Sequence, residues 1–253
     1  MRRGLAYILL GLLAYTVSLV LLCPASLLIE QLAQRLPGFS AQNVQGSAVQ
    51  GSAQSVQLSA TARLETIAWR LRVLPLLLGR IEYELRLTAP ELNIWGIAGV
   101  GFDRQLRITA LNGQLPLPRA IALAGRPPPP LNGTLELENV AVHLNRDGRP
   151  QQAGGLVHLR NVSTSFGNPL PLGNFDIQLQ TQASALVASI QDQGGPLQLN
   201  GNLTLDPDGR YRFTAQAAPR DQDNRELYQA LNLLGRPEGN GKWTFDLAGS
   251  LQV

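Results

Sequence analysis

Glu82 and Glu84 are the two residues of this sequence whose types and spacing most resemble a catalytic pair. On a β-strand, residues two positions apart lie on the same face, about 7 Å from each other. That separation suits the two carboxyl groups of a glycoside hydrolase. Arg86 follows on the same face, however, and such a row of charges is typical of a solvated strand surface. We therefore interpret Glu82 and Glu84 as surface charges and expect no enzymatic activity.

The two histidines and the single cysteine are too few for a typical zinc site with His and Cys ligands. His143 and His158 each stand on the polar side of an alternating run, so we expect both side chains to point towards solvent. Cys23 has no second cysteine with which to form a disulfide within the chain. The sequence contains neither a G-x-S-x-G nor an H-E-x-x-H motif. We predict no catalytic, cofactor-binding or metal-binding residues.

A glycine repeat, VQGSAVQGSA at 44–53, is a second candidate for chemistry, because glycine loops can cradle phosphate groups. A phosphate loop needs a preceding strand, a following helix and a lysine, and these signals are missing here. The pattern instead predicts that Gly46 and Gly51 flank a strand that turns and enters a sheet. The net charge of +3, to which Arg2 and Arg3 contribute, argues against a nucleic-acid partner.

Residues 1–23 are predicted to form a cytoplasmic tip and a transmembrane anchor. From Gly4 to Leu22 the chain has no ionisable side chain other than tyrosine. A helix of this length spans roughly 28 Å, which is enough to cross the hydrocarbon layer. Arg2 and Arg3 precede it, so the positive-inside rule places the N-terminus in the cytoplasm. A cleaved signal peptide is the alternative. Residues 24–43 are predicted to form a juxtamembrane amphipathic helix and a linker.

Residues 44–253 show the alternation of half-buried β-strands; Ile81 to Leu87, for example, alternates apolar and charged residues. NRDGR at 145–149 and DPDGR at 206–210 predict hairpins, because Asp-Gly readily supplies positive φ. GRPPPP at 125–130 predicts an extended connection, either within one continuous sheet or, alternatively, between two subdomains. We predict an all-β fold, mainly antiparallel, in one periplasmic domain.

A short motif with glycine on the apolar side predicts the shape of this sheet. The copies are LNGQLPL at 111–117, LNGTLEL at 131–137, LNGNLTL at 199–205 and LAGSLQV at 247–253. Such a glycine leaves a gap that allows a sheet to bend sharply or another backbone to approach. We therefore predict a strongly curved sheet, half-barrel or taco-like, with its apolar side inward. Alternatively, Asn-Gly merely begins a turn before each strand.

A short C-terminal helix is predicted after residue 222. Asp223 is the expected N-cap, with Glu226 completing a capping box. An apolar stripe follows, and Gly235 and Pro237 end the helix. The stripe consists of Leu227, Ala230, Leu231 and Leu234. We expect it to cover one open end of the sheet; a stripe that binds a partner protein is the alternative.

The order of these features resembles protein N of the bacterial type II secretion system. The matching stretches are GSAVQGSA at 46–53, AWRLRVLPLLLGRIEYELRL at 68–87 and LYQALNLLGRPEGNGKWTFDLAGSL at 227–251, behind the apolar first segment. The similarity spans nearly the full chain. Its most specific part is Trp69 followed by Pro75, Leu76 to Leu78 and Gly79. Gln50 departs from the family, which often carries an aromatic residue before the second glycine.

The resemblance implies a non-enzymatic component of the Gram-negative inner membrane that supports export of folded periplasmic proteins across the outer membrane. It implies a scaffold or accessory role, with inner-membrane protein C and the platform proteins as partners. It brings no catalytic residues and no cofactor. The one-sided apolar sheet alone predicts a different function, that of an envelope lipid-handling protein that binds acyl chains in an apolar β groove.

Overall fold

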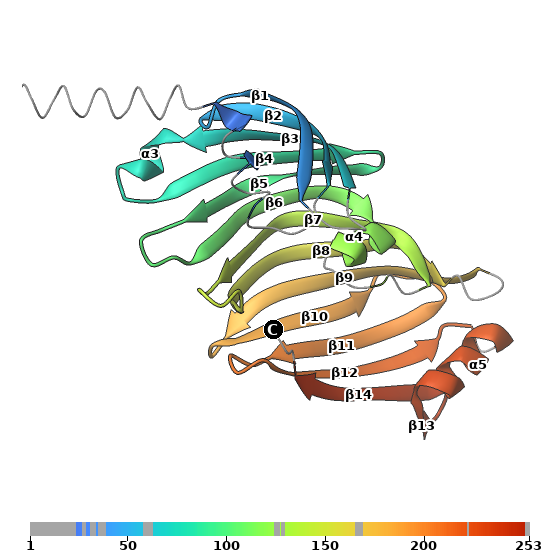
Figure 1. Ribbon diagram of the computed structural model, residues 1–253. Coiled ribbons are helices and arrows are strands. Elements are labelled where there is room, and N and C mark those ends of the chain that lie inside the picture. Colours follow the sequence, from blue (N-terminus) through green and yellow to red (C-terminus); the bar gives the residue numbers. More distant parts are fainter. Residues whose placement is uncertain are drawn as a thin grey trace, which may run out of the picture.

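The computed structural model describes residues 24–26, 29–30, 34, 39–57, 63–123, 127, 130–164, 169–221 and 223–250. Fourteen strands form one sheet in which every neighbouring pair is antiparallel (Figure 1). The strands follow chain order across the sheet, except that β14 lies between β12 and β13. The predicted all-β, antiparallel fold is confirmed.

The strands are β1 (Ser40–Gly46), β2 (Gln50–Gln57), β3 (Arg63–Arg72), β4 (Ile81–Ala89), β5 (Leu92–Val100), β6 (Leu106–Pro116), β7 (Leu131–Leu144), β8 (Pro150–Thr164), β9 (Leu170–Gln182), β10 (Ala185–Asp192), β11 (Leu197–Leu205), β12 (Arg210–Pro219), β13 (Arg236–Gly239) and β14 (Lys242–Ser250). Short helices with bounds inside the described residues are α3 (Val73–Leu76), α4 (Leu117–Leu123) and α5 (Arg225–Leu234).

Both predicted hairpin signals form tight turns. Asn145–Arg149 joins β7 to β8, and Asp206–Arg210 joins β11 to β12. In each turn the glycine has the positive φ that Asp-Gly was expected to supply, +75° at Gly148 and +88° at Gly209. β6 and β7, which flank GRPPPP, pair with each other, so the sheet continues across that segment.

The sheet is open and is not strongly curled, so the prediction of a half-barrel or taco-like shape is wrong. β1 and β13 are the outermost strands at its two edges. The motif glycines serve local contacts instead. A Cβ at Gly113, where φ is +134°, would lie 2.0 Å from the backbone oxygen of Asn93, and one at Gly201 would lie 2.7 Å from the Ala215 Cβ. These glycines allow close approach of the neighbouring strand, which was the second reason offered for them.

Bulges interrupt the central ladders. Asn139 on β7 and Asn161 on β8 have positive φ, and the registers shift beside them. The backbone N–H of Asn139 donates to the Asn112 side chain at 2.9 Å, and that of Asn161 donates to the Asn174 side chain at 2.8 Å. A side-chain amide thus satisfies each bulged backbone group, and bulges of this kind increase local twist.

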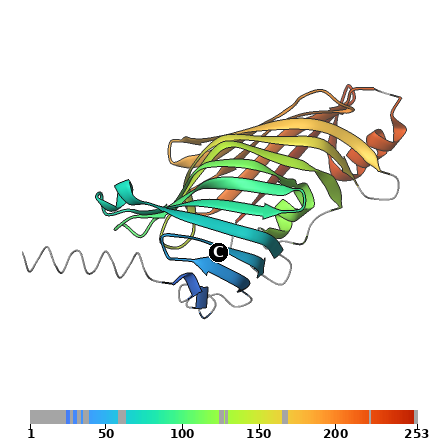
Figure 2. The ribbon, with the colours of Figure 1, turned by 90° about the horizontal axis from the view of Figure 1, so that it is seen from above.

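Two hydrophobic clusters lie under different parts of the sheet. The first cluster contains Phe39, Ala53, Val56, Leu64, Ala89, Leu92, Ile94 and Leu115, with Ala120 and Leu123 of α4 packed against it. The second contains Val162, Leu170, Phe175, Leu197, Ala217, Leu227, Leu231 and Trp243. Figure 2 shows α5 at the far end of the sheet from β1. The sequence did not predict α3 or α4, because helices of four and seven residues are too short to show a helical period of apolar residues.

The C-terminal helix is confirmed as α5, with two differences. Asn224, one residue after the predicted Asp223, is the N-cap, and its side chain accepts a hydrogen bond from the Leu227 N–H at 3.0 Å. Leu227 and Leu231 are buried against the sheet as expected, whereas Leu234 is exposed. The stripe was expected to cover one open end of the sheet; in the structure its residues Leu227 and Leu231 pack in the second cluster, beside Trp243 of β14.

The predicted anchor at 1–23 and most of the predicted amphipathic helix lie outside the described residues. Within the part of the chain that is described, no helix has the length and apolar character that a membrane span requires. β1 begins at Ser40, so the sheet starts inside the range 24–43. The division of the chain into domains stays a prediction.

Candidate functional site

Glu82 and Glu84 lie on β4 and share a cation from the neighbouring strand. Arg72 of β3 lies directly opposite Glu82 in the ladder. Its guanidinium is 3.0 Å from the Glu82 carboxylate and 3.7 Å from that of Glu84. The expected neighbour on the same strand, Arg86, makes neither of these ion pairs. A partly exposed cross-strand arrangement of this kind stabilises a sheet modestly, and the structure places both glutamates as surface charges.

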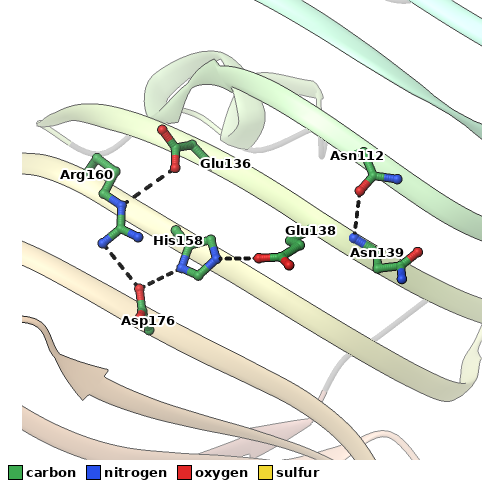
Figure 3. A network of polar contacts seen from close by, with 7 residues as sticks. All are labelled: Asn112, Glu136, Glu138, Asn139, His158, Arg160 and Asp176. Carbon is green, nitrogen blue, oxygen red and sulfur yellow. Dashed lines mark hydrogen bonds and ion pairs between the residues drawn. The ribbon is translucent and has the colours of Figure 1, made fainter.

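His158 lies at the centre of a charged network on β7, β8 and β9 (Figure 3). Its Nδ1 is 2.7 Å from the Asp176 carboxylate and its Nε2 is 3.2 Å from that of Glu138. Arg160 connects the same Asp176, at 3.3 Å, to Glu136, at 3.6 Å. The network is assembled because His158 stands opposite Glu136 on one side and Asp176 on the other.

His158 lies on the polar face of the sheet, level with Glu136 and Asp176, but it points towards solvent less than predicted, since only 16% of its side chain is exposed. The hydrogen bond that His158 donates to the Asp176 carboxylate raises the pKa of His158 above its ordinary value. Partial burial lowers this pKa, and the hydrogen bond to Glu138 raises it further. Protonated His158 donates from both ring nitrogens to carboxylates. With Arg160 it then balances part of the charge of three acidic groups, and the network ties three strands together.

This arrangement offers little for catalysis. A general base or a metal ligand needs a free lone pair on the imidazole, and both nitrogens of His158 face carboxylates. No group of three His, Cys, Asp or Glu residues suited to a metal ion occurs in the described part of the chain. His143, the other histidine, borders a separate shallow hollow with Arg80, Glu82 and Arg107. The structure does not bring the two histidines together.

The glycine repeat at 44–53 forms the first hairpin, in which Gly46 of β1 pairs with Gly51 of β2. Two aromatic side chains hold its turn by hydrogen bonds to backbone carbonyl oxygens. Trp69 Nε1 donates to the carbonyl oxygen of Ser47 at 3.1 Å, and the Tyr83 hydroxyl donates to that of Ala48 at 3.1 Å. A Cβ at Gly51 would lie 2.6 Å from the Trp69 ring. Glycine is therefore needed where the indole crosses the hairpin. The sequence predicted that Gly46 and Gly51 flank a strand that turns into the sheet, whereas the structure places them on either side of the turn between two strands.

A group of exposed apolar side chains surrounds α3, and we call it the apolar rim. It consists of Val73, Leu74, Leu76, Leu77, Leu78, Ile81, Val100 and Phe102. The sequence did not reveal this exposure, because an apolar run without alternation normally indicates a buried segment. The signals that set it apart are Pro75 and Gly79, which interrupt the strand pattern and place the leucines in a connection.

Comparison with known proteins finds a family model that covers most of the chain. The model for "Type II secretion system (T2SS), protein N" matches residues 37–246. The type II secretion system protein N of Vibrio cholerae serotype O1 is 30% identical over 260 residues, which cover 99% of this chain and all of the relative. That of Aeromonas hydrophila is 26% identical over 258 residues and 96% of each chain. No solved structure matches.

Proposed function

Because the chain belongs to the type II secretion system protein N family, we propose that it is a scaffold or accessory protein of the inner-membrane part of that system. In this role it supports the export of folded periplasmic proteins across the outer membrane and catalyses no reaction. The observation that carries the proposal is the match over nearly the whole chain to a relative named as a type II secretion component.

The proposed location is the inner membrane, with a single span at 4–22 and the sheet in the periplasm. The charge pattern supports this orientation, since Arg2 and Arg3 precede the apolar segment and the next charged residue is Glu30. The sheet also carries no cysteine, so its stability in an oxidising compartment depends on packing alone. Alkaline phosphatase fused to the C-terminus should be active in cells, and an inactive but intact fusion would contradict the orientation.

The secretion role is tested by deletion. A strain without this chain should accumulate an exported protein in its periplasm, and expression of the wild-type chain should restore export. Normal export in the deletion strain would overturn the proposal. Since the proposed role involves no catalysis, export should also be restored by a chain in which the two paired glutamates of β4, Glu82 and Glu84, are replaced by glutamine.

We place the proposed protein partners, inner-membrane protein C and the platform proteins, on surfaces that remain exposed after folding. Tyr228 and Leu233 are exposed on α5, although Leu227 of the same helix is buried. A photo-crosslinker at 233 should capture a secretion component if α5 is a partner surface. If a crosslinker at 233 reacts with none of them, then α5 serves only to cover the sheet.

A lipid-handling function is the second candidate, and one row of side chains favours it. Leu179, Ala188, Leu203, Phe213 and Leu247 are direct neighbours across five strands on the apolar face. All of them are at least partly exposed. An acyl chain laid across this row would cover them. A photo-crosslinker at Leu203 should then form lipid adducts in cells, while one at Thr204, on the opposite face, should not; equal labelling at both sites would remove the support for this function.

A further inference from the structure

The apolar rim is one continuous surface formed by two connections. Leu77 is 83% exposed in the connection between β3 and β4, and Phe102 is 88% exposed in the connection between β5 and β6. A Cβ built on Gly79 would lie 1.7 Å from a Phe102 ring carbon, so the phenylalanine ring rests on the first connection. Most of the large apolar side chains that are exposed in the described structure belong to this rim.

The rim lies at the end of the strands where Pro24, the first described residue after the apolar segment, contacts the sheet. Pro24 forms an isolated antiparallel bridge with Ser47, in the turn of the first hairpin. In the same turn, the backbone oxygen of Val49 accepts a hydrogen bond from the Leu71 N–H at 2.6 Å. Leu71 lies two residues before the start of α3. Only Cys23 separates Pro24 from Leu22, the last residue of the apolar segment. A bilayer that holds residues 4–22 therefore lies close to the rim.

The charges around the rim suit a membrane surface. Arg107 and Arg72 form ion pairs with the nearby carboxylates of Asp103 and Glu82, respectively. Arg80 and Arg104 are exposed in the same two connections, and neither is in an ion pair within the described residues. Apolar side chains beside unpaired arginines are typical of segments that bind the interface of anionic bilayers.

The opposite end of the strands differs. α4 and α5 lie there, at the right of Figure 1, whereas α3 projects at the left. Further along the α3 end, the connections are polar, with NRDGR at 145–149 and DPDG at 206–209. Among the described connections at this end, the apolar ones are those that lie towards Pro24. This coincidence with the point of attachment favours a membrane contact, because a surface beside the anchor faces the bilayer that holds the anchor.

We propose that the apolar rim inserts into the interfacial layer of the bilayer that anchors residues 4–22. Leu77, Leu78 and Phe102 lie below the lipid headgroups, and Arg80 and Arg104 lie at the level of the lipid phosphates. The rim then gives the sheet a second attachment and fixes its orientation relative to the membrane. This inference rests on the proposed anchor.

Fluorescence quenching by lipids tests the insertion. The full-length chain, with Cys23→Ser and either Leu77→Cys or Phe102→Cys, carries an environment-sensitive fluorophore and is reconstituted in vesicles of phosphatidylethanolamine and phosphatidylglycerol. Leu233→Cys on α5 is the matched control, because Leu233 is exposed to a similar extent, 85%. Insertion a few ångströms below the headgroups predicts roughly twofold quenching by a shallow spin-labelled lipid at 77 and 102, with no change at 233.

The outcomes separate this inference from the proposed anchor. Flotation of the vesicles at alkaline pH reports whether the chain is anchored, independently of the rim. A floating chain whose labels at 77 and 102 are no better quenched than the label at 233 overturns rim insertion but leaves the anchor in place. A rim that docks on a protein gives this same result in vesicles without other proteins. Failure to float overturns the anchor, and rim insertion in its stated form with it.

A functional comparison uses paired charge substitutions. Leu77→Asp with Leu78→Asp should reduce export in complemented cells, because two carboxylates oppose insertion beside anionic lipid. Ala183→Asp with Ser184→Asp places the same charges in the exposed connection between β9 and β10, away from the rim, and should leave export unchanged. In vesicles, the label at 77 should be quenched less when Leu78→Asp is added to the Leu77→Cys chain. Equal quenching with and without Leu78→Asp would contradict the proposal even if both chains folded.

Discussion

Replacement of Trp243 by alanine should release α5 from the sheet. Trp243 lies on β14 with 1% of its surface exposed, in the same cluster as Leu227 and Leu231 of α5. Its ring meets that of Tyr228 edge-on, with the centroids 4.9 Å apart. Its Nε1 donates to the Asn232 side chain at 3.0 Å. One indole therefore contacts successive turns of the helix by packing, ring geometry and a hydrogen bond.

The size of the effect follows from these contacts. Truncation of a buried tryptophan to alanine costs about 3–5 kcal/mol, including the cavity that remains. The edge-on ring pair contributes about 0.5–1.5 kcal/mol and the hydrogen bond about 1 kcal/mol. α5 has 10 residues, fewer than the roughly 12 that an isolated helix needs to be even marginally stable in water. Once undocked, α5 should therefore unfold.

Two measurements on the full-length chain in detergent follow this change. Urea denaturation, followed by far-ultraviolet circular dichroism, gives the free energy of unfolding, and hydrogen exchange of peptides covering 223–235 reports on α5 directly. Trp95→Ala is the matched control, because Trp95 is 46% exposed on β5 and its loss should change stability by no more than about 0.5 kcal/mol. Our account of α5 is refuted if Trp243→Ala costs no more than Trp95→Ala, or if α5 keeps its protection.

Three further changes test other parts of the structure. Asp176 raises the pKa of His158 in the folded protein. His158 therefore stabilises the fold fully at pH values below its pKa in the unfolded chain, and this stabilisation is lost as the pH rises through its pKa in the folded protein. His158→Gln should accordingly lower the urea midpoint more at about pH 5.5 than at about pH 8.5. Gly51→Ala should destabilise the first hairpin by about 1–3 kcal/mol in urea denaturation, because its Cβ meets an indole ring at 2.6 Å. Glu82→Gln with Glu84→Gln should cost at most about 1 kcal/mol, since the ion pairs are partly exposed, and should leave export intact in complemented cells.

Each of these predictions has its own control. In an Asp176→Asn background, the pH dependence caused by His158→Gln should shrink; an unchanged dependence would place its origin outside the network. Gly154→Ala should lower the free energy of unfolding much less than Gly51→Ala does, because no atom of the described residues lies closer than 4.0 Å to the added Cβ. Equal losses of stability in the two variants would contradict the account of the hairpin. Lost export from the glutamine double variant, if the protein stays folded and abundant, would argue for a functional role of the two carboxylates.

The sequence determined the strands and several of their connections, because these depend on neighbouring residues. Alternation from Ile81 to Leu87 predicts β4, since side chains on a strand point to opposite faces with a period of two. Asp-Gly at 147–148 and 208–209 predicts turns, since this pair accepts positive φ. The stripe of α5 is local in the same way, and its cap was missed by one residue because Asp223 and Asn224 are both good N-cap residues.

The tertiary structure alone decided which residues meet across the sheet and what shape the sheet takes. Asp176 is 18 residues from His158 along the chain, and only the ladder between β8 and β9 brings them together. Glycine on an apolar face permits either a bend or a close approach, and only the position of the neighbouring strand selects between them. Whether the two outermost strands meet depends on twist accumulated over fourteen strands, which no local pattern specifies. The exposure of the apolar-rim leucines was likewise decided by the fold, because it depends on the absence, in the described part of the chain, of a packed neighbour beside their connection, which the run of leucines does not show.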